Sequence, residues 1–457
     1  MSNKTDKKVA VVDEVLPFKQ MLIFGFQHIL IMCSGAVSIP LIVGNAAGLS
    51  NEEIIFLINA DLFIAGIATL IQSLGFGKFI GGKIPMVEGA SFAGINAMVA
   101  IASTYKGEPM TAITTIFGSV FIAGIFCFIM APFWAKLIRF FPNVVTGTVI
   151  TIIGLSLIPV TVRWSAGGNV AAPNFASSEN IFMAIFVLGI ILCLSQFLKG
   201  ILGNLSILFG LIIGTIVATF TGMADFSSVS EAAWISVNIP FHFGFPRFDV
   251  SAIVSMILVM VVIMTAATGN IVTVHEIVEK PMDDKSLARG LRSEGFVTMI
   301  AAIFNTFPQS VYAQNVGLLS LTGIKSRFVV ATSGGILVCL GLFPKMGAVV
   351  TSIPYPVLGG AGFIMFGMVI AAGVKSLGRV NFDGSKNGVI VAVSIGISMI
   401  STVVPEFYHD FPQWVNTFFS SGITTGSLSA ILLNLFFNEM STKKVENISR
   451  TKLVKNN

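Results

Sequence analysis

Residues 308 to 317 read Pro308-Gln309-Ser310-Val311-Tyr312-Ala313-Gln314-Asn315-Val316-Gly317, and this stretch decides the fold. It lies among long apolar runs, yet it is too short and too polar for a plain helix that crosses a membrane. A second interrupted stretch reads Pro85-Met86-Val87-Glu88-Gly89-Ala90-Ser91-Phe92. We expect each stretch to be extended at first and then helical, with the free N–H groups of the helix start facing a site.

The composition around these stretches is that of a polytopic membrane protein. Of 457 residues, 54% are hydrophobic and only 11% are charged, whereas soluble proteins average about 25% charged residues. This excludes a soluble enzyme, a secreted disulfide scaffold and a nucleic-acid-binding domain. Because no two cysteines are spaced as C-x-x-C and the short polar loops hold no nucleophile-base set, we expect no metal, no cofactor and no enzymatic activity.

Apolar runs predict an all-α protein with fourteen membrane segments. They cover residues 21–46, 54–75, 85–102, 110–133, 143–162, 180–197, 204–224, 250–274, 295–307, 309–322, 328–350, 358–374, 387–404 and 419–437. The interrupted stretches are the third and the tenth segments, which are matching places in two groups of seven. Because seven is odd, the second group enters the membrane from the opposite side, so we expect a 7+7 inverted repeat, in which such stretches mark a transporter's binding site.

The charges support this count. With fourteen spans, four of the 27 Lys and Arg residues lie outside, namely Lys106, Arg163, Arg247 and Lys345, and the other 23 lie inside. This agrees with the positive-inside rule and predicts that both termini are cytoplasmic.

Few ionisable side chains lie within these segments, and each is a functional candidate because it is costly in a bilayer. Glu88 is a candidate for substrate contact and for proton coupling, since burial favours the neutral form of a carboxyl group; the alternative is a structural hydrogen-bonding role. His28 and Glu294, which we place at the entrance of the ninth segment, are further coupling candidates. Asp61 is expected to join neighbouring helices.

Polar and aromatic residues of the interrupted stretches are binding candidates. The Gln314 amide offers donors and an acceptor, which suit the edge of a flat heterocycle, while Asn315 can hold the surrounding backbone; both could instead join two helices. Phe92, Tyr312 and Phe307 could stack on a ligand or belong to the core.

The motif Gln314-Asn315-Val316-Gly317 followed by Thr322-Gly323 resembles the Q-N-x-G-x-x-x-x-T-G signature of the nucleobase-ascorbate transporter family, in particular its bacterial xanthine and uric acid permeases. Phe304-Asn305-Thr306-Phe307-Pro308, Gln27-His28 and Ser293-Glu294-Gly295 extend the resemblance, which runs from about Phe18 to Phe437.

The resemblance implies a core domain and a gate domain that shift against each other in an elevator-like manner. The core comprises residues 21–133 and 250–350, and the gate comprises residues 134–224 and 351–437, between cytoplasmic tails at 1–20 and 438–457. It also implies a homodimer in the plasma membrane that imports xanthine, uric acid or a related base with protons. The expected substrate contacts are Gln314, Glu88, Ala266, Phe92 and Ala313, and the expected supporting residues are Asn315, Gly317, Thr322, Gln27 and His28.

The eighth segment departs from the family. The family's E-S/T-x-G pattern carries a glutamate that bonds the base, but here the sequence reads Ala266-Ala267-Thr268-Gly269. The acidic group could have moved across the pocket to Glu88. Two alternatives therefore stay open: a permease for another nucleobase such as uracil, and a non-coupled or sensor-like homologue.

Overall fold

Helices make up almost all of the structure, a computed structural model that describes residues 10–137, 141–170, 172–199, 201–408, 410–412, 419 and 421–440. Residues 1–9 and 441–457, which hold much of both expected tails, lie outside the described residues. The α-helices are α1 Phe18–Ala36, α2 Ser38–Ala47, α3 Asn51–Leu74, α4 Ile95–Thr104, α5 Pro109–Leu137, α6 Asn143–Ser165, α7 Ser178–Phe197, α8 Ile201–Asn204, α9 Ser206–Phe220, α10 Ser227–Glu231, α11 Val250–Ile277, α12 Asp284–Ile303, α13 Ala313–Thr322, α14 Arg327–Leu340, α15 Pro344–Thr351, α16 Tyr355–Leu377, α17 Asn387–Val403 and α19 Gly422–Asn434.

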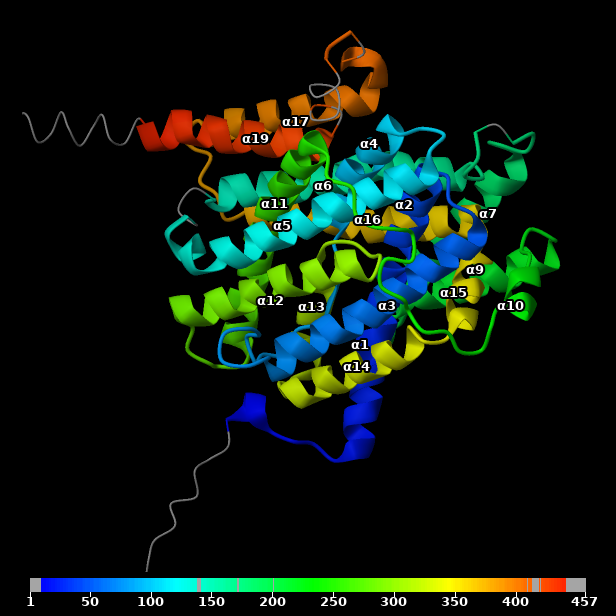
Figure 1. The fold of residues 1–457 in the computed structure, drawn as a ribbon, viewed down its shortest axis with the longest axis horizontal. Coiled ribbons are helices and arrows are strands. Elements are labelled where there is room, and N and C mark those ends of the chain that lie inside the picture. Colours follow the sequence, from blue (N-terminus) through cyan, green and yellow to red (C-terminus); the bar gives the residue numbers. More distant parts are fainter. Residues whose placement is uncertain are drawn as a thin grey trace, which may run out of the picture.

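Short elements complete the fold. The strands are β1 Glu88–Ala90 and β2 Gln309–Val311; the 3-10 helices include η1 Val11–Asp13, η2 Phe92–Gly94 and η4 Pro405–Tyr408; and a π-helical turn covers Leu435–Glu439. Figure 1 shows several long helices, among them α3, α5, α12 and α16, running side by side, with α17 and α19 along one margin.

The long helices are of membrane type. Within the described residues, six helices are long and apolar enough to cross a bilayer: α3, α5, α6, α7, α11 and α16. A seventh span results if α14 and α15, which meet at a bend of 84°, are counted as one broken helix. Shorter apolar helices, including α4, α9 and α17, accompany them.

The structure corrects two expected boundaries and the placement of one residue. Residues 21–46 were predicted as one segment, but the helix breaks at Val37 between α1 and α2. The ninth segment was predicted to begin at Gly295, whereas α12 begins at Asp284, where the Asp283 carboxylate caps it by accepting from the Ser286 N–H at 2.8 Å. Glu294 is therefore not at a helix entrance but in the middle of α12, and it is buried.

The helices form two groups by their contacts. In the first, α5 packs against α11, α12 and α4, and α3 packs against α14, α15, α12 and α2. In the second, α16 packs against α6, α7 and α9, while α17 and α19 pack against each other and against α6. Fewer contacts join the groups, mainly from α11 and α4 to α6 and α19.

Close helix contacts depend on glycine. A Cβ on Gly295 of α12 would lie 2.5 Å from the Phe128 backbone nitrogen, and one on Gly124 of α5 would lie 2.8 Å from the Met299 nitrogen. Small residues let membrane helices approach until their backbones touch. These two glycines therefore set the separation of α5 and α12, which carries Glu294.

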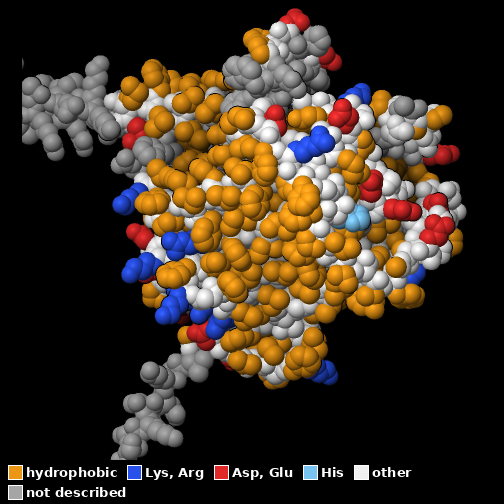
Figure 2. Space-filling view, in the orientation of Figure 1, with side chains coloured by type: hydrophobic (Ala, Val, Ile, Leu, Met, Phe, Trp, Pro, Cys, Tyr) orange, Lys and Arg blue, Asp and Glu red, His pale blue; other side chains and the backbone are white. Residues whose placement is uncertain are grey.

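The surface has an apolar band with charge at its edges. Figure 2 shows hydrophobic side chains over the middle of the molecule, Lys and Arg gathered at the left edge, and many of the Asp and Glu side chains toward the right. Exposed Phe182, Phe197 and Phe220 belong to the apolar surface. So large an exposed apolar area is typical of contact with lipid or with another protein.

The charge pattern predicts that the N-terminal tail, the loop after α11 and the loop before α14 lie on one side of the membrane. These three segments are in contact at one end of the first group of helices. Arg327 at the start of α14 forms an ion pair with Asp13 at 2.6 Å, and Lys325 forms one with Glu279 at 2.6 Å. The hydrogen bond from the Lys325 ammonium lowers the pKa of the Glu279 carboxyl group. The described part of the N-terminal tail is thus held against α14.

Cysteine labelling should test the topology. Single cysteines at Lys106 and Lys345 should react with an impermeant thiol reagent in intact cells, whereas one at Lys285, or at Lys444 outside the described residues, should react only after permeabilisation. The reason is that the positive-inside rule predicts the side rich in basic residues to be cytoplasmic. Labelling of Lys285→Cys from outside would contradict the division of residues 295–322 into two segments, and with it the inverted repeat.

Candidate functional site

The two interrupted stretches meet in a two-stranded antiparallel sheet. Glu88 pairs with Val311, Gly89 with Ser310, and Ala90 with Gln309. Backbone hydrogen bonds at both ends extend the pairing, from the Tyr312 N–H to the Val87 carbonyl at 3.0 Å and from the Ser91 N–H to the Pro308 carbonyl at 2.8 Å. The extended backbone predicted at both stretches is confirmed.

Side chains from neighbouring helices satisfy the outer edges of this sheet. The Glu88 N–H donates to Thr69 Oγ1 of α3 at 3.0 Å, and the Gln309 N–H donates to Thr298 Oγ1 of α12 at 3.1 Å. The Val311 N–H faces the Glu294 carboxyl group, one helical turn before Thr298. Buried backbone donors need such partners, so α3 and α12 enclose the sheet from its two sides. The sequence did not single out Thr69 or Thr298 for this role.

Both strands lead directly into helix starts. The β1 strand continues through η2 into α4, and β2 continues into α13; neither start has a side-chain cap. Within the described residues, the N–H groups of Phe92, Ala93, Ala313 and Gln314 donate no backbone hydrogen bond. Because the strands are antiparallel, the two helices begin at opposite ends of the sheet. The length of strand between the two helix starts is four residues, roughly 13 Å. Each start is a favourable place for a polar or negatively charged group.

Three expected contact residues lie at these starts. Gln314 is half-buried and makes no hydrogen bond within the described residues, and Ala313 beside it is exposed. The ring of Phe92, also half-buried, has its centroid 6.3 Å from that of Tyr312. The second interrupted stretch therefore supplies the free side-chain amide of Gln314, and the first supplies the aromatic face of Phe92.

Ala266 lies apart from this cluster, on α11 next to the second group of helices. It lines a crevice of about 10 Å³, which is room for about one water molecule. The opposite wall is apolar and includes Val149, Ile150 and Ile431. Among the described residues that line this crevice none is basic, and its polar side chains are the hydroxyls of Thr146 and Thr265.

Two acidic side chains are buried beside the sheet. Glu88 and Glu294 are each 1% exposed, and no basic side chain pairs with either carboxyl group among the described residues. The two carboxyl groups interact electrostatically, and the Gln72 amide also lies near Glu88. Two carboxylates cannot both be ionised at low cost in such a place. The pair has the chemistry of a proton-binding site.

Asn315 and His28 are in direct contact. Asn315 Nδ2 donates to the His28 carbonyl at 2.8 Å and lies 3.1 Å from His28 Nδ1. This contact joins α13 to α1. Nearby on α1, Gln27 is half-buried, and its side-chain oxygen has no partner among the described residues.

The other two expected supporting residues form no side-chain hydrogen bond with the binding candidates among the described residues, although they share α13 with Ala313 and Gln314. Gly317 is exposed, and a Cβ there would meet nothing within 4 Å. Thr322 donates to the Leu318 carbonyl of its own helix at 2.9 Å. Gly323, which follows, ends α13 with a φ of 68°, a value that favours glycine.

Asp61 holds the chain where it enters β2. Its Oδ1 accepts from Thr306 Oγ1 at 2.6 Å and from Gln309 Nε2 at 3.2 Å. Asp61 was predicted to join neighbouring helices, but its bonds join α3 to the loop before β2 and to β2 itself, neither of which is helical.

Asp61→Ala should destabilise the folded protein by about 1 to 3 kcal/mol, because it leaves the buried Thr306 hydroxyl without an acceptor and the Gln309 amide with the Phe307 carbonyl alone. Asp61→Asn should cost less, since its amide oxygen can still accept from both. The midpoint of heat-induced loss of the monodisperse peak in detergent measures the effect. A wild-type midpoint in Asp61→Ala would contradict it.

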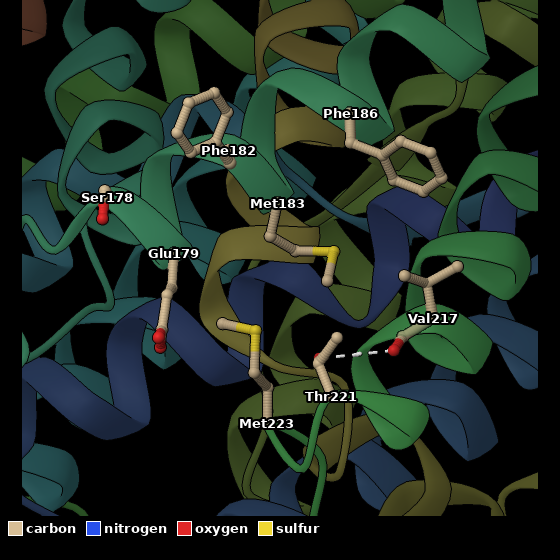
Figure 3. A pocket seen from close by; sticks show the side chains of 8 residues that line it. All are labelled: Ser178, Glu179, Phe182, Met183, Phe186, Val217, Thr221 and Met223. Atoms are coloured by element: carbon tan, nitrogen blue, oxygen red, sulfur yellow. Dashed lines mark hydrogen bonds between the residues drawn. The ribbon is translucent and has the colours of Figure 1, made fainter.

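A larger hollow lies elsewhere. It has a volume of about 430 Å³ and opens between α7 and α9, where Phe182, Met183 and Met223 line it together with Glu179 (Figure 3). It contains none of the candidate site residues. Size alone therefore does not locate the site.

Comparison with known proteins identifies similar sequences along most of the chain. The sequence model of a family of xanthine and uric acid permeases, described as the Permease family, matches residues 19–407. The uric acid permease PucJ of Bacillus subtilis is 42% identical, over 92% of this chain and 93% of its own length. The xanthine permease of the same organism is 41% identical over 94% and 96%, and the uric acid transporter UacT of Escherichia coli is 38% identical over 96% and 90%.

Solved structures share the fold at low identity. The transmembrane domain of the cyanobacterial bicarbonate transporter BicA superposes with a TM-score of 0.63 at 16% identity, covering 92% of this chain and all of that domain. The murine anion transporter Solute Carrier 26 family member A9 gives a TM-score of 0.60 at 12% identity, covering 92% of this chain and 68% of that protein.

Proposed function

Because the chain belongs to the nucleobase-ascorbate transporter family, among its xanthine and uric acid permeases, we propose that it carries a purine nucleobase, xanthine, uric acid or a related base, across the plasma membrane. One observation carries this most directly. The signature residues Gln314 to Gly317 lie at the start of a helix that follows a strand paired with the matching stretch of the first half. A donor-acceptor amide and free N–H groups thus lie at the start of α13, next to Tyr312, whose ring contacts that of Phe92.

In this proposal Gln314 bonds the edge of the base, the N–H groups of Ala313 and Phe92 bind its carbonyl oxygens, and Phe92 packs against its face. Xanthine and uric acid carry several ring N–H and carbonyl groups in one plane, which suit an amide and backbone donors. Asn315 and His28 hold α13 in place.

The transport cycle we propose is an elevator-like shift of a core domain, residues 21–133 and 250–350, against a gate domain, residues 134–224 and 351–437. The two groups of helices support this division, since the paired strands belong to the first group and α6 and α16 to the second. The full fold would have fourteen segments in two inverted halves, both termini in the cytoplasm, and a homodimer as the working unit.

Protons drive import in this proposal. With no carboxylate at position 266, Glu88 is the closest acidic group to the sheet, since it is part of β1. Its buried and unpaired carboxyl group, next to that of Glu294, supports a role in binding the coupled proton. His28 is a weaker candidate, because its ring nitrogen lies against the Asn315 amide.

Radiolabelled uptake in cells that lack their own purine permeases tests the function. Cells that express this chain should accumulate xanthine or uric acid, and an imposed inward proton gradient should increase the accumulation. Unlabelled xanthine, uric acid, hypoxanthine, guanine and uracil should then compete in an order that identifies the substrate. Uptake of uracil alone would favour the alternative nucleobase permease, and binding of a purine without accumulation would favour the non-coupled homologue.

A further inference from the structure

A buried amide lies beside the acidic pair formed by Glu88 and Glu294, on the side that the charge pattern predicts to be cytoplasmic. Gln72, near the end of α3, is 0% exposed. It lies one turn beyond Thr69, whose hydroxyl accepts from the Glu88 N–H at 3.0 Å. Its side-chain nitrogen lies 3.5 Å from the carbonyl oxygen of Gly290, which is one turn before Glu294 on α12. Gln72 is therefore next to both members of the pair.

The loop after α3 fixes the orientation of this amide. The Gly82 N–H donates to Gln72 Oε1 at 2.9 Å. The loop is itself held against α12, because the Gly81 N–H donates to the Arg289 carbonyl at 3.1 Å. Gly81 has a φ of 88°, and a Cβ there would collide with the Ile71 carbonyl oxygen, so this fold of the loop requires glycine. Because its oxygen is bound to the loop, the amide faces away from the loop with its N–H groups.

These N–H groups face the acidic pair. One is directed at the Gly290 carbonyl oxygen, which leaves the other for the Glu88 carboxyl group beside it. An amide N–H can only donate, so it bonds more strongly to an ionised carboxylate than to the protonated acid. Among the described residues, the titratable groups that interact with Glu88 are the Glu294 carboxyl group of α12 and the Cys127 thiol of α5, and neither is a cation.

We propose that Gln72 is a positioning residue for the coupled proton, which holds an N–H donor at the acidic pair and so favours release of the proton toward the cytoplasm. The proposal rests on the proton-coupled function proposed above. When Glu88 loses its proton, the Gln72 N–H bonds to a carboxylate that burial would otherwise leave at a high cost in free energy. Without this donor, the pair should keep its proton up to a higher pH.

The pH dependence of uptake into proteoliposomes tests this role. Gln72→Met keeps an unbranched side chain of similar length but has no N–H donor. It should raise the external pH at which proton-driven uptake is half-maximal by about one unit, which is roughly the difference between a hydrogen bond to an ion and one to a neutral group. The KM for the base and its counterflow exchange should stay at the wild-type values, because Gln72 lies outside the proposed base contacts.

Asn180→Leu is the matched control, because it also removes a buried amide that ties a loop to a helix, here in the second group of helices. The Asn180 amide donates to the Ala166 carbonyl at 3.1 Å and to the Asn174 carbonyl at 2.8 Å. This variant should leave the half-maximal pH unchanged. Gln72→Asn covers the case in which Gln72→Met fails to fold. Its shorter side chain withdraws the N–H from the pair, so the half-maximal pH should again rise.

The outcomes separate this role from the proposed function. A wild-type half-maximal pH in folded Gln72→Met or Gln72→Asn would overturn the role of Gln72 and leave purine transport in place. An equal rise in Asn180→Leu would also overturn it, since the pH profile would then respond to any loosened loop. A wild-type chain that accumulates purine without pH dependence would overturn the proton coupling itself, and one that transports no purine would overturn the proposed function as well.

Discussion

Replacing Gln314 with alanine should raise the apparent KM for the purine by roughly 5- to 150-fold and abolish high-affinity uptake, while the amount of protein in the membrane stays at the wild-type level. The range corresponds to a loss of about 1 to 3 kcal/mol when one partner of a buried hydrogen-bonded pair is removed. The protein itself should remain folded, because the Gln314 side chain makes no hydrogen bond within the described residues. Initial uptake rates across a range of base concentrations measure the effect.

Ser320→Ala provides the comparison for Gln314→Ala. Ser320 is exposed on the same helix, two turns further along, and its removal should leave KM unchanged. An unchanged KM in Gln314→Ala would remove Gln314 from the site. A fall in membrane expression with an unchanged KM per folded molecule would instead show that Gln314 joins helices.

Glu88→Gln should eliminate accumulation against a gradient and most of the pH dependence of uptake, while still permitting exchange of the base between equal compartments. The amide keeps the shape of the protonated carboxyl group but can neither take up nor release a proton. It also leaves no cation without its partner, because no basic side chain bonds to Glu88 among the described residues. Proteoliposomes allow both measurements, with counterflow for exchange and an imposed proton gradient for accumulation.

Glu294→Gln, measured in the same vesicles, separates the two members of the acidic pair. If both variants lose accumulation, the pair acts as one proton-binding site; if only Glu88→Gln does, Glu294 modifies its partner. Proton-driven accumulation at the wild-type level per folded molecule in Glu88→Gln would eliminate Glu88 from coupling. A structural role would show as less folded protein with unchanged coupling.

The extended backbone at residues 88–90 and 309–311 could be predicted from the sequence, whereas the start of the neighbouring helix α12 and the register of the strands could not. Proline and glycine next to Glu88 and Gln309 were enough to indicate extended strands, but three-residue strands carry too little pattern to set a register. The start of α12 was missed because apolar runs alone were counted. Its first turns are polar, and the signal that could have located it was Asp283 followed by Ser286.

The partners of the site residues could not be read from the sequence because they are distant in the chain. Glu294 is a helix-centre residue beside Glu88, which depends on how closely Gly124 and Gly295 bring α5 and α12 together. Thr69 and Thr298 are small polar residues in membrane helices. Their role as acceptors for strand N–H groups depends on where the sheet lies, which the sequence does not show.

The pairing of β1 with β2 also has a consequence for biosynthesis. The β1 strand is synthesised first, and it has no partner strand until residue 311 has left the ribosome. Until then the nascent chain holds an unpaired strand in the membrane, where unsatisfied backbone groups are costly. Thr69, only 19 positions from Glu88, can cover one of these groups at once, but the rest depend on the second half. A ribosome stalled before residue 309 should therefore yield a fragment that is inserted yet readily degraded, and co-expression of the missing half should rescue it.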